Sequence, residues 1–265
     1  MIILIFLVLG LIVGSFLNVL VYRLHTAEDI VWDRSRCPRC HHVIGWYDNV
    51  PVVSFVLLKA RCRNCKKKIS WQYPLVEIGT GVMFALAGAY FFNVGDPASW
   101  GPVIYLLGVL FALVAIFVYD ALYLEIPDIV LWPAVVWVLA FGFFFSWNMV
   151  SLKENIFDIA MLSRFLGAAA AFAFFWLMAR VSREKWMGMG DAWLVLLLGL
   201  ILGWPRILLA LFLAFLIGSI YGIMLIAVGK YTLKSRVPFA PFLVLGTLIA
   251  LFFYAPIVGW YLGLF

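Results

Sequence analysis

The chain has 265 residues, of which 66% are hydrophobic and only 12% are charged, and its formal net charge is +6. Soluble domains usually carry about 25% charged residues, so this composition excludes an ordinary water-soluble globular fold. It predicts an all-α polytopic membrane protein, because runs of about 20 apolar residues match a bilayer core and show none of the alternation of a membrane β-barrel. We expect about eight transmembrane helices, the sixth of them short for a full crossing, in the apolar runs 1–22, 74–92, 102–119, 129–147, 165–179, 192–205, 207–229 and 237–265.

The first run, 1–22, has no basic residue before it and no small-residue cleavage site after it, so we expect a membrane helix and not a cleaved signal peptide. Lys and Arg concentrate in cytoplasmic segments, and Arg23 follows this run directly. With the N-terminus outside the cytoplasm, the cytoplasmic side holds 16 of the 19 Lys and Arg residues, ten in 23–73, three in 180–191 and three in 230–236. The positive charge therefore indicates orientation in an inner (cytoplasmic) membrane and contact with lipid, and no binding of nucleic acid.

One polar segment, 23–73, interrupts the apolar chain and contains all four cysteines as two C-x-x-C pairs. This spacing is typical of a structural zinc site, in which two tight turns each offer two thiolates to one tetrahedral ion. So short a segment has too small a core to fold easily alone, and a metal can stabilise it. Disulfides or redox pairs are the alternatives, and the expected cytoplasmic location argues against stable disulfides. The predicted ligands are Cys37, Cys40, Cys62 and Cys65, while His25, His41 and His42 are expected to be solvated.

Acidic residues near the membrane are candidates for function, because ionisable groups at bilayer depth are costly. Asp120 ends the third run and Asp191 opens the sixth, both on the predicted cytoplasmic side. Two carboxylates held close together share a proton, so one can activate water while the other protonates the leaving group of a peptide. A salt-bridged or capping pair is the alternative, and Asp128 is expected to be a helix cap. Gly188 and Gly190 indicate a close backbone approach or unusual backbone angles just before Asp191.

Several short motifs follow one another along nearly the whole chain. The paired cysteines and the G-x-G-D at 188–191 are two of them. The others are G-S-F-L-N-V at 14–19 with Y-R-L at 22–24, W-Y-D-N-V-P at 46–51, I-S-W-Q-Y-P-L-V-E at 69–77, Asp120 with I-P-D at 126–128, and P-F-A-P-F at 238–242.

This ordered set resembles the bacterial type IV prepilin peptidases, the leader peptidase/N-methyltransferase family, whose G-x-G-D is shared with presenilin-like intramembrane aspartyl proteases. The resemblance implies that Asp120 and Asp191 are the catalytic pair. It also implies the reaction: removal of the basic leader of type IV prepilins or type II secretion pseudopilins at the cytoplasmic face, then methylation of the new N-terminal amine with S-adenosyl-L-methionine. The sequence departs from the family pattern at Trp193, where Lys is common, and at Ala240, where Gly is common.

The cofactor site of the implied methyltransferase is less evident from the sequence. No glycine-rich loop follows a strand, so a Rossmann-type site is not expected. S-adenosyl-L-methionine is a sulfonium cation, and cations favour aromatic faces and nearby carboxylates. The candidates are Trp46, Tyr47, Asp48, Trp71 and Glu77. The alternative is that the aromatic residues form an interfacial belt and that Glu77 is a structural partner for a helix.

The expected organisation is a first transmembrane helix (1–22), a cytoplasmic four-cysteine zinc module associated with methylation (23–73) and a membrane aspartyl peptidase domain (74–265). The sequence leaves two other functions open: a peptidase without methyltransferase activity, and a non-enzymatic zinc-stapled membrane scaffold or transporter. A scaffold should tolerate Asn in place of Asp120 or Asp191, whereas the enzyme should not.

Overall fold

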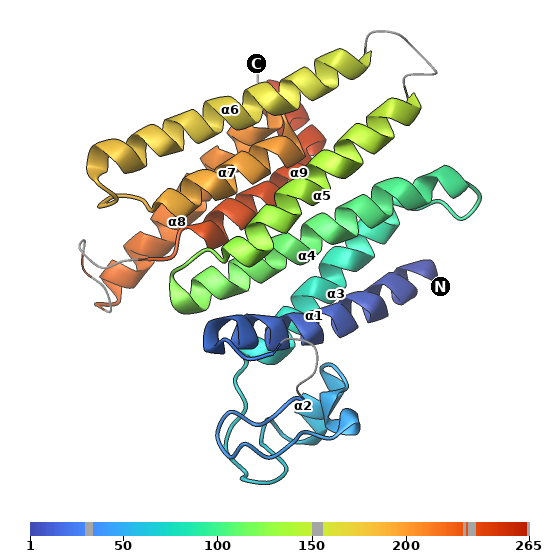
Figure 1. The fold of residues 1–265 in the computed structure, drawn as a ribbon, viewed down its shortest axis with the longest axis vertical. Helices are drawn as coiled ribbons and strands as arrows, with labels where there is room; N and C mark the ends of the chain where they lie inside the picture. Colours follow the sequence, from blue (N-terminus) through green and yellow to red (C-terminus); the bar gives the residue numbers. More distant parts are fainter. Residues whose placement is uncertain (30–33, 150–155, 230–231, 233–236, 264–265) are drawn as a thin grey trace. The chain divides into compact units, whose positions relative to one another are not determined.

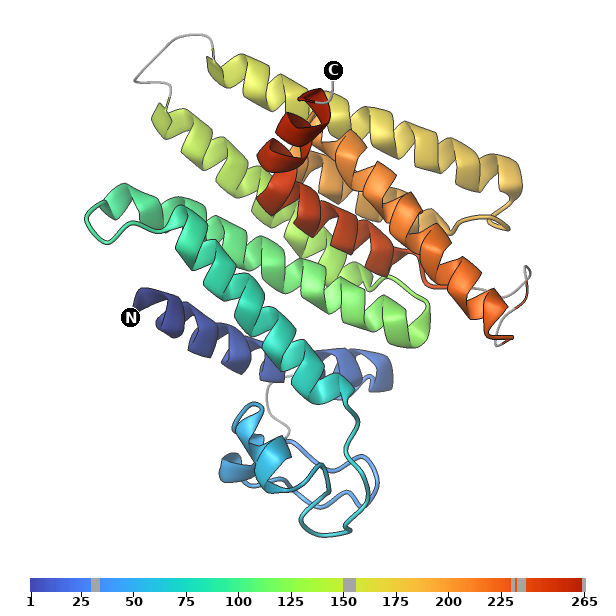
Figure 2. The same cartoon turned by 180° about the vertical axis from the view of Figure 1, so that it is seen from behind.

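The structure is a computed structural model that shows a chain of helices (Figures 1 and 2). No β-sheet forms among the described residues, although two isolated β-bridges occur. The chain divides into two compact units, Met1–Val118 and Tyr119–Phe265. Most of the basic segment 230–236 lies outside the described residues. The structure describes residues 1–29, 34–149, 156–229, 232 and 237–263.

The first unit, Met1–Val118, contains two helices that pack along each other, α1 (Ile2–Thr26) and α3 (Gln72–Phe91). Glycine permits their close approach, because a Cβ on Gly14 would lie only 2.7 Å from the Cα of Glu77. Small residues at such positions let membrane helices pack backbone to backbone. The result is that the C-terminal half of α1 and the N-terminal half of α3 are held at short distance.

The polar segment between α1 and α3 contains little regular structure. It holds the 3-10 turn η1 (Trp46–Asn49) and the short helix α2 (Val53–Leu57). After α3, the turn η2 (Pro97–Ser99) leads into α4 (Trp100–Tyr123), whose last residues belong to the second unit. The predicted boundary between residues 73 and 74 stays a prediction.

The second unit, Tyr119–Phe265, is a bundle arranged around one short helix, α7. Ala192, Leu194 and Val195 on α7 are completely buried. Gly199 lets the helix approach its neighbour α6, since a Cβ there would lie 2.4 Å from the Cα of Ala168. The helices after α4 are α5 (Asp128–Met149), α6 (Ile156–Ser182), α7 (Met189–Leu202), α8 (Arg206–Ala227) and α9 (Ala240–Leu262).

Six helices of the described chain are long and apolar enough to cross a membrane, and two further apolar helices are shorter. The shorter ones are the stretch Asp128–Gly142 of α5 and α7 with its 14 residues. Bulky apolar side chains are exposed on several spans, as expected for surfaces that face lipid; on α8 these include Leu208, Phe212, Phe215, Ile220 and Ile223. The predicted all-α, multi-pass membrane fold is therefore confirmed.

Candidate functional site

Asp120 lies in the last turn of α4 and is 5% exposed. Its Oδ2 accepts a hydrogen bond of 3.2 Å from the backbone N–H of Ala240, the first residue of α9. The first N–H groups of a helix have no partner inside the helix. Phe239, the N-cap of α9, supplies no side-chain bond, and Pro241 has no N–H to satisfy. Asp120 therefore caps α9 from a distant part of the chain.

Asp191 occupies the third position of α7, after the N-cap Gly188. Its carboxylate accepts a hydrogen bond from the backbone N–H of Gly188, which is one half of a capping box. Gly188 has ordinary extended angles (φ −74°, ψ 154°), and Gly190 does not have a positive φ. The expectation of unusual backbone angles at these two glycines is therefore wrong. A Cβ on Gly190 would lie 3.4 Å from Cδ1 of Ile126, at the near limit of ordinary contact, so Ile126 is the neighbour that a larger side chain would meet there.

The two carboxylates lie close enough for their charges to interact. Within the described chain, no Lys, Arg or His forms an ion pair with Asp120 or Asp191. The first turns of α7 and α9 point their partly positive ends at these carboxylates, which favours negative charge without a full cation. The structure thus holds two interacting carboxyl groups in the second unit, each oriented by one backbone N–H. Asp128, by contrast, is exposed at the start of α5.

Trp193 does not place a polar group beside this pair. Its ring lies against Trp132 of α5, at 5.3 Å between centroids, and against Phe172 of α6, at 4.7 Å. An aromatic cluster between α5, α6 and α7 therefore occupies the position where the family commonly carries Lys.

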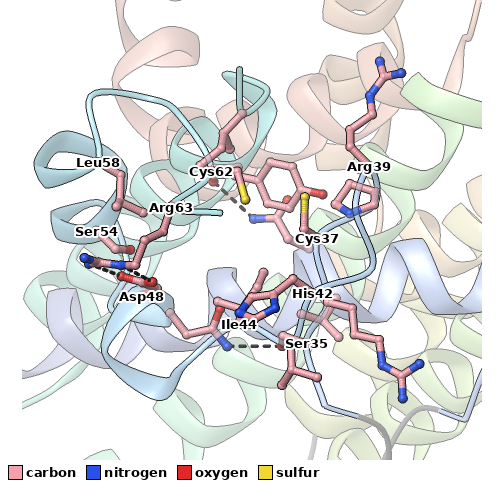
Figure 3. A pocket seen from close by; sticks show the side chains of 18 of the residues that line it. Ser35, Cys37, Arg39, His42, Ile44, Asp48, Ser54, Leu58, Cys62 and Arg63 are labelled. Carbon is pink, nitrogen blue, oxygen red and sulfur yellow. Dashed lines mark hydrogen bonds and ion pairs between the residues drawn. The ribbon is translucent and has the colours of Figure 1, made fainter. Parts of the chain in front are cut away.

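The four cysteines of the first unit come together as the spacing predicts. Their Sγ atoms all lie within 4.8 Å of one another. A tetrahedral zinc site with bonds of about 2.3 Å needs sulfur atoms about 3.8 Å apart, so the cluster fits such an ion. Figure 3 shows the sulfur atoms of Cys37 and Cys62 directed toward each other. The histidines His25, His41 and His42 are exposed, as expected.

The two C-x-x-C turns have the same local geometry. In the first turn the N–H of Cys37 donates to the carbonyl of His42, and in the second the N–H of Cys62 donates to that of Lys67. The residues after the second cysteines, His41 and Lys66, both adopt positive φ, at 54° and 58°. The backbone N–H of His42 also stabilises the Cys40 thiolate and lowers the pKa of that thiol to about 7. The first turn therefore favours a thiolate at Cys40, whereas desolvation and the neighbouring cysteine side chains raise the pKa of Cys65 in the second turn to about 11.

A cavity of about 940 Å³ lies between the cysteine turns and the ends of α1 and α3. Three of the five cofactor candidates line it, Tyr47, Asp48 and Glu77, whereas Trp46 and Trp71 do not and are 83% and 68% exposed. Asp48 is already neutralised, because Arg63 donates two hydrogen bonds to it, at 2.8 and 2.7 Å (Figure 3). Arg63 accordingly lowers the pKa of Asp48.

Glu77 is the candidate that the fold buries most deeply, at 7% exposure. Its Oε2 accepts a hydrogen bond of 2.7 Å from the backbone N–H of Val52. Sequence reasoning missed two further features: the N–H of Ala240 at Asp120, and the cavity-lining Asn18. Both lie inside motifs singled out above, but a motif does not tell which backbone group faces which side chain.

Comparison with known proteins identifies the family. The model of the bacterial peptidase A24 N-terminal domain matches residues 8–91, and that of the type IV leader peptidase family matches residues 104–223. A prepilin leader peptidase/N-methyltransferase of Pseudomonas putida is 31% identical over 92% of this chain and 88% of its own length. Its namesake from Myxococcus xanthus (strain DK1622) is 37% identical over 84% of this chain, which spans 63% of that relative. No solved structure matches. The chain therefore belongs to the type IV leader peptidase family, among proteins named prepilin leader peptidase/N-methyltransferase.

Proposed function

We propose that this protein removes the leader peptides of type IV prepilins and pseudopilins and then methylates the new N-terminal amine. The observation that carries the peptidase half is the pair Asp120 and Asp191, two interacting carboxyl groups with no cationic partner among the described residues. Family membership supports the substrate class and the second, methyl-transferring activity.

The chemistry follows from the different surroundings of the two carboxyl groups. One carboxylate accepts a proton from the attacking water while the other carboxyl donates its proton to the carbonyl oxygen, which gives a gem-diol. The first carboxyl then passes the proton taken from water to the leaving amine as the C–N bond breaks, and the diol returns a proton to the second carboxylate. The N–H groups of Ala240 and Gly188 hold Asp120 and Asp191 in fixed orientations, so neither side chain has to be reoriented during the reaction. Gly188 and Gly190 are proposed to support the site as the residues that lead into Asp191, Gly188 through the N–H that faces its carboxylate.

The cysteine cluster is proposed to hold a structural zinc ion. Cys37, Cys40, Cys62 and Cys65 supply four thiolates, which leaves no open coordination position for a substrate. The ion would fix the two turns that form one wall of the cavity in the first unit.

S-adenosyl-L-methionine, when bound, supplies the methyl group. The residues proposed to face it line the cavity of the first unit and include Tyr47 and Glu77, an aromatic ring and a carboxylate suited to a cation. The exposed Trp46 and Trp71 are better explained as interfacial aromatic residues.

The orientation proposed from the basic residues places both sites on the cytoplasmic side of the inner membrane. Asp120 ends α4 and Asp191 begins α7 after the basic connection that contains Arg183 and Lys185. Prepilin leaders are basic and remain on this side, so substrate and carboxylates would meet there.

The test is co-expression of a prepilin with the wild-type chain, Asp120→Asn or Asp191→Asn. We expect each variant to lose leader removal by a factor of about 10³ or more, because neither amide can take or give the required proton. Glu184→Gln, an exposed carboxylate in the same unit, is the matched control and should cleave normally. Normal processing by both Asn variants would leave a scaffold or transporter as the explanation. A product whose N-terminal residue lacks the mass of one methyl group would reduce the function to peptidase only.

A further inference from the structure

The short helix α2 divides its side chains between two surroundings. Ser54 and the following Leu58 line the cavity of the first unit (Figure 3). The outer face of α2 is apolar and exposed, by 52% at Val53, 66% at Val56 and 76% at Leu57. These three residues share one face because positions i, i+3 and i+4 lie together on a helix. Exposed apolar patches mark contacts with a partner or a membrane, so the outer face of α2 is a candidate contact surface.

The outer face of α2 adjoins a surface of α3 that faces lipid. Within α2, the ring of Phe55 lies against that of Trp71, the N-cap of α3, at 5.0 Å between centroids. Exposed apolar side chains follow one another at i, i+4, i+7 and i+11 along one face of α3, namely Trp71, Leu75, Ile78 and Val82. In a membrane span such a stripe is turned to lipid. The apolar surface therefore continues from α3 to α2.

The attachment of α2 to α3 places it at the edge of the bilayer. The N–H of Val52, directly before α2, donates to Oε2 of Glu77 at 2.7 Å. Glu77 lies in the second turn of α3, about 8 Å along the axis from its first residue at 1.5 Å per residue. Amphipathic helices in the membrane interface bury their apolar faces by about 5–10 Å. The start of α2 is therefore held beside the first turns of a membrane span and not beyond its end.

Basic side chains flank the outer face of α2. Lys59 and Arg61 follow the helix, and their N–H groups donate to the carbonyls of Val56 and Leu58. Within the described chain both side chains are exposed, neither lines the cavity and neither forms an ion pair. The whole segment 23–73 carries ten Lys and Arg against four Asp and Glu. An apolar face bordered by cations complements a membrane surface that carries anionic headgroups.

We propose that α2 docks the cysteine-containing segment onto the membrane, with its outer face in the apolar layer and with Lys59 and Arg61 at anionic phosphate headgroups. The inner side of α2 lines the cavity, so the membrane supports this wall of the cavity from outside. The alternatives are that the second unit or a second copy of the chain covers the outer face. Continuity with α3 and the flanking cations together favour lipid. The proposal goes beyond cleavage and methylation and depends on neither activity.

The experiment maps what the outer face of α2 contacts in a bilayer. The photoreactive residue p-benzoylphenylalanine replaces Leu57 or, separately, Val53 in the full-length chain. The protein is placed in nanodiscs with equal amounts of phosphatidylcholine and phosphatidylglycerol and irradiated, and the adducts are identified by mass. Arg39 is the matched control site, because it is exposed and lies across the cavity from Ser54 and Leu58 (Figure 3). The size-exclusion profile reports whether each variant is folded.

We expect lipid adducts at Leu57 and Val53 to exceed those at Arg39 at least about tenfold. Phosphatidylglycerol should exceed phosphatidylcholine among them about fivefold, the effect of one basic side chain near an anionic surface. The double substitution Lys59→Gln and Arg61→Gln should bring this ratio close to one and leave the lipid adducts in place.

The other outcomes each overturn a defined part of the proposal. Adducts with 119–265 of the same chain, or a cross-linked dimer, would assign the outer face of α2 to the second unit or to a second copy. Lipid adducts no more frequent than at Arg39 would mean that this face meets water. Equal labelling by the two lipids in wild type, or a preference that survives the double substitution, would exclude the headgroup contact of Lys59 and Arg61.

Discussion

Asp120 and Asp191 each accept one backbone N–H from the start of a helix, but they reach it in different ways. Asp191 turns back onto its own helix, as an acidic residue at the third position commonly does. Asp120 reaches across the fold to Ala240, a residue 120 positions away in the chain. The geometry of Asp120 therefore depends on tertiary packing of α4 and α9, whereas that of Asp191 is largely local. Substitutions at the start of α7 should therefore test the local contribution to the geometry of Asp191.

Gly190 is the residue at which a local change should disturb the site most directly. A Cβ at this position would lie 3.4 Å from Cδ1 of Ile126, at the near limit of ordinary contact, so the two further methyl groups of Gly190→Val are expected to push the connection before α5 away from α7. We expect leader cleavage to fall at least about tenfold, because small displacements of catalytic groups carry large kinetic penalties. Ile126→Ala in the same chain should restore much of the activity by removing the obstructing atoms. The measurement is the cleavage rate at matched protein levels.

Gly188 provides the comparison for this prediction. A Cβ there would meet Asp191 Oδ2 at 3.8 Å, an ordinary contact, and the N–H that bonds Asp191 is retained. Gly188→Ala should therefore cleave within a few-fold of wild type. If Gly188→Ala were as inactive as Gly190→Val, glycine would be required for a reason other than the contact with Ile126.

The position of helix α7 inside the bundle could not be predicted from the sequence. Its 14 residues rise only about 21 Å, short of a bilayer core of about 30 Å. The structure surrounds it with other helices, so it need not match the bilayer as a lipid-facing span does. Uniformly apolar composition does not distinguish burial in protein from exposure to lipid, because both environments accept the same side chains.

The close contact of α6 and α7 leads to a stability prediction. Gly199→Ala places a Cβ 2.4 Å from the Cα of Ala168, a backbone atom that cannot rotate away. We expect the substitution to lower the free energy of unfolding by about 1–3 kcal/mol or more, as overpacking does. Gly222→Ala on α8 meets nothing within 4 Å and should be neutral or slightly stabilising. Thermal unfolding in detergent measures both, and equal melting temperatures would contradict the close packing.

Across the whole molecule, the chemistry divides between the two units. The carboxyl pair belongs to Tyr119–Phe265, and the cysteine cluster and its cavity belong to Met1–Val118. The two family models separate at a similar place, 8–91 and 104–223. Cleavage and methylation are therefore expected to depend on different parts of the chain.

The fold class, the family and the gathering of the cysteines could all be predicted from sequence, because hydropathy and ligand spacing are properties of short segments. Partners that meet only after packing could not be predicted. The N–H of Ala240 at Asp120 and the contact of Gly190 with Ile126 join segments whose relative positions no local pattern encodes. The hydrogen bond from Nδ2 of Asn18 to the carbonyl of Tyr73 is of the same kind, since it joins α1 to the first turn of α3.

Removing the metal should separate the two activities. Cys37→Ser takes away one of four ligands, and we expect loss of the zinc ion that elemental analysis would detect in wild type. Without the ion the cysteine turns lose their cross-link, so the cavity wall and methylation should be lost, with methylation falling at least about tenfold. Leader cleavage should persist within a few-fold, because Asp120 and Asp191 belong to the other unit. Asp191→Asn should show the opposite pattern, with normal zinc content and no cleavage. Loss of cleavage in parallel with zinc across a chelator titration would instead mean that the metal supports both units.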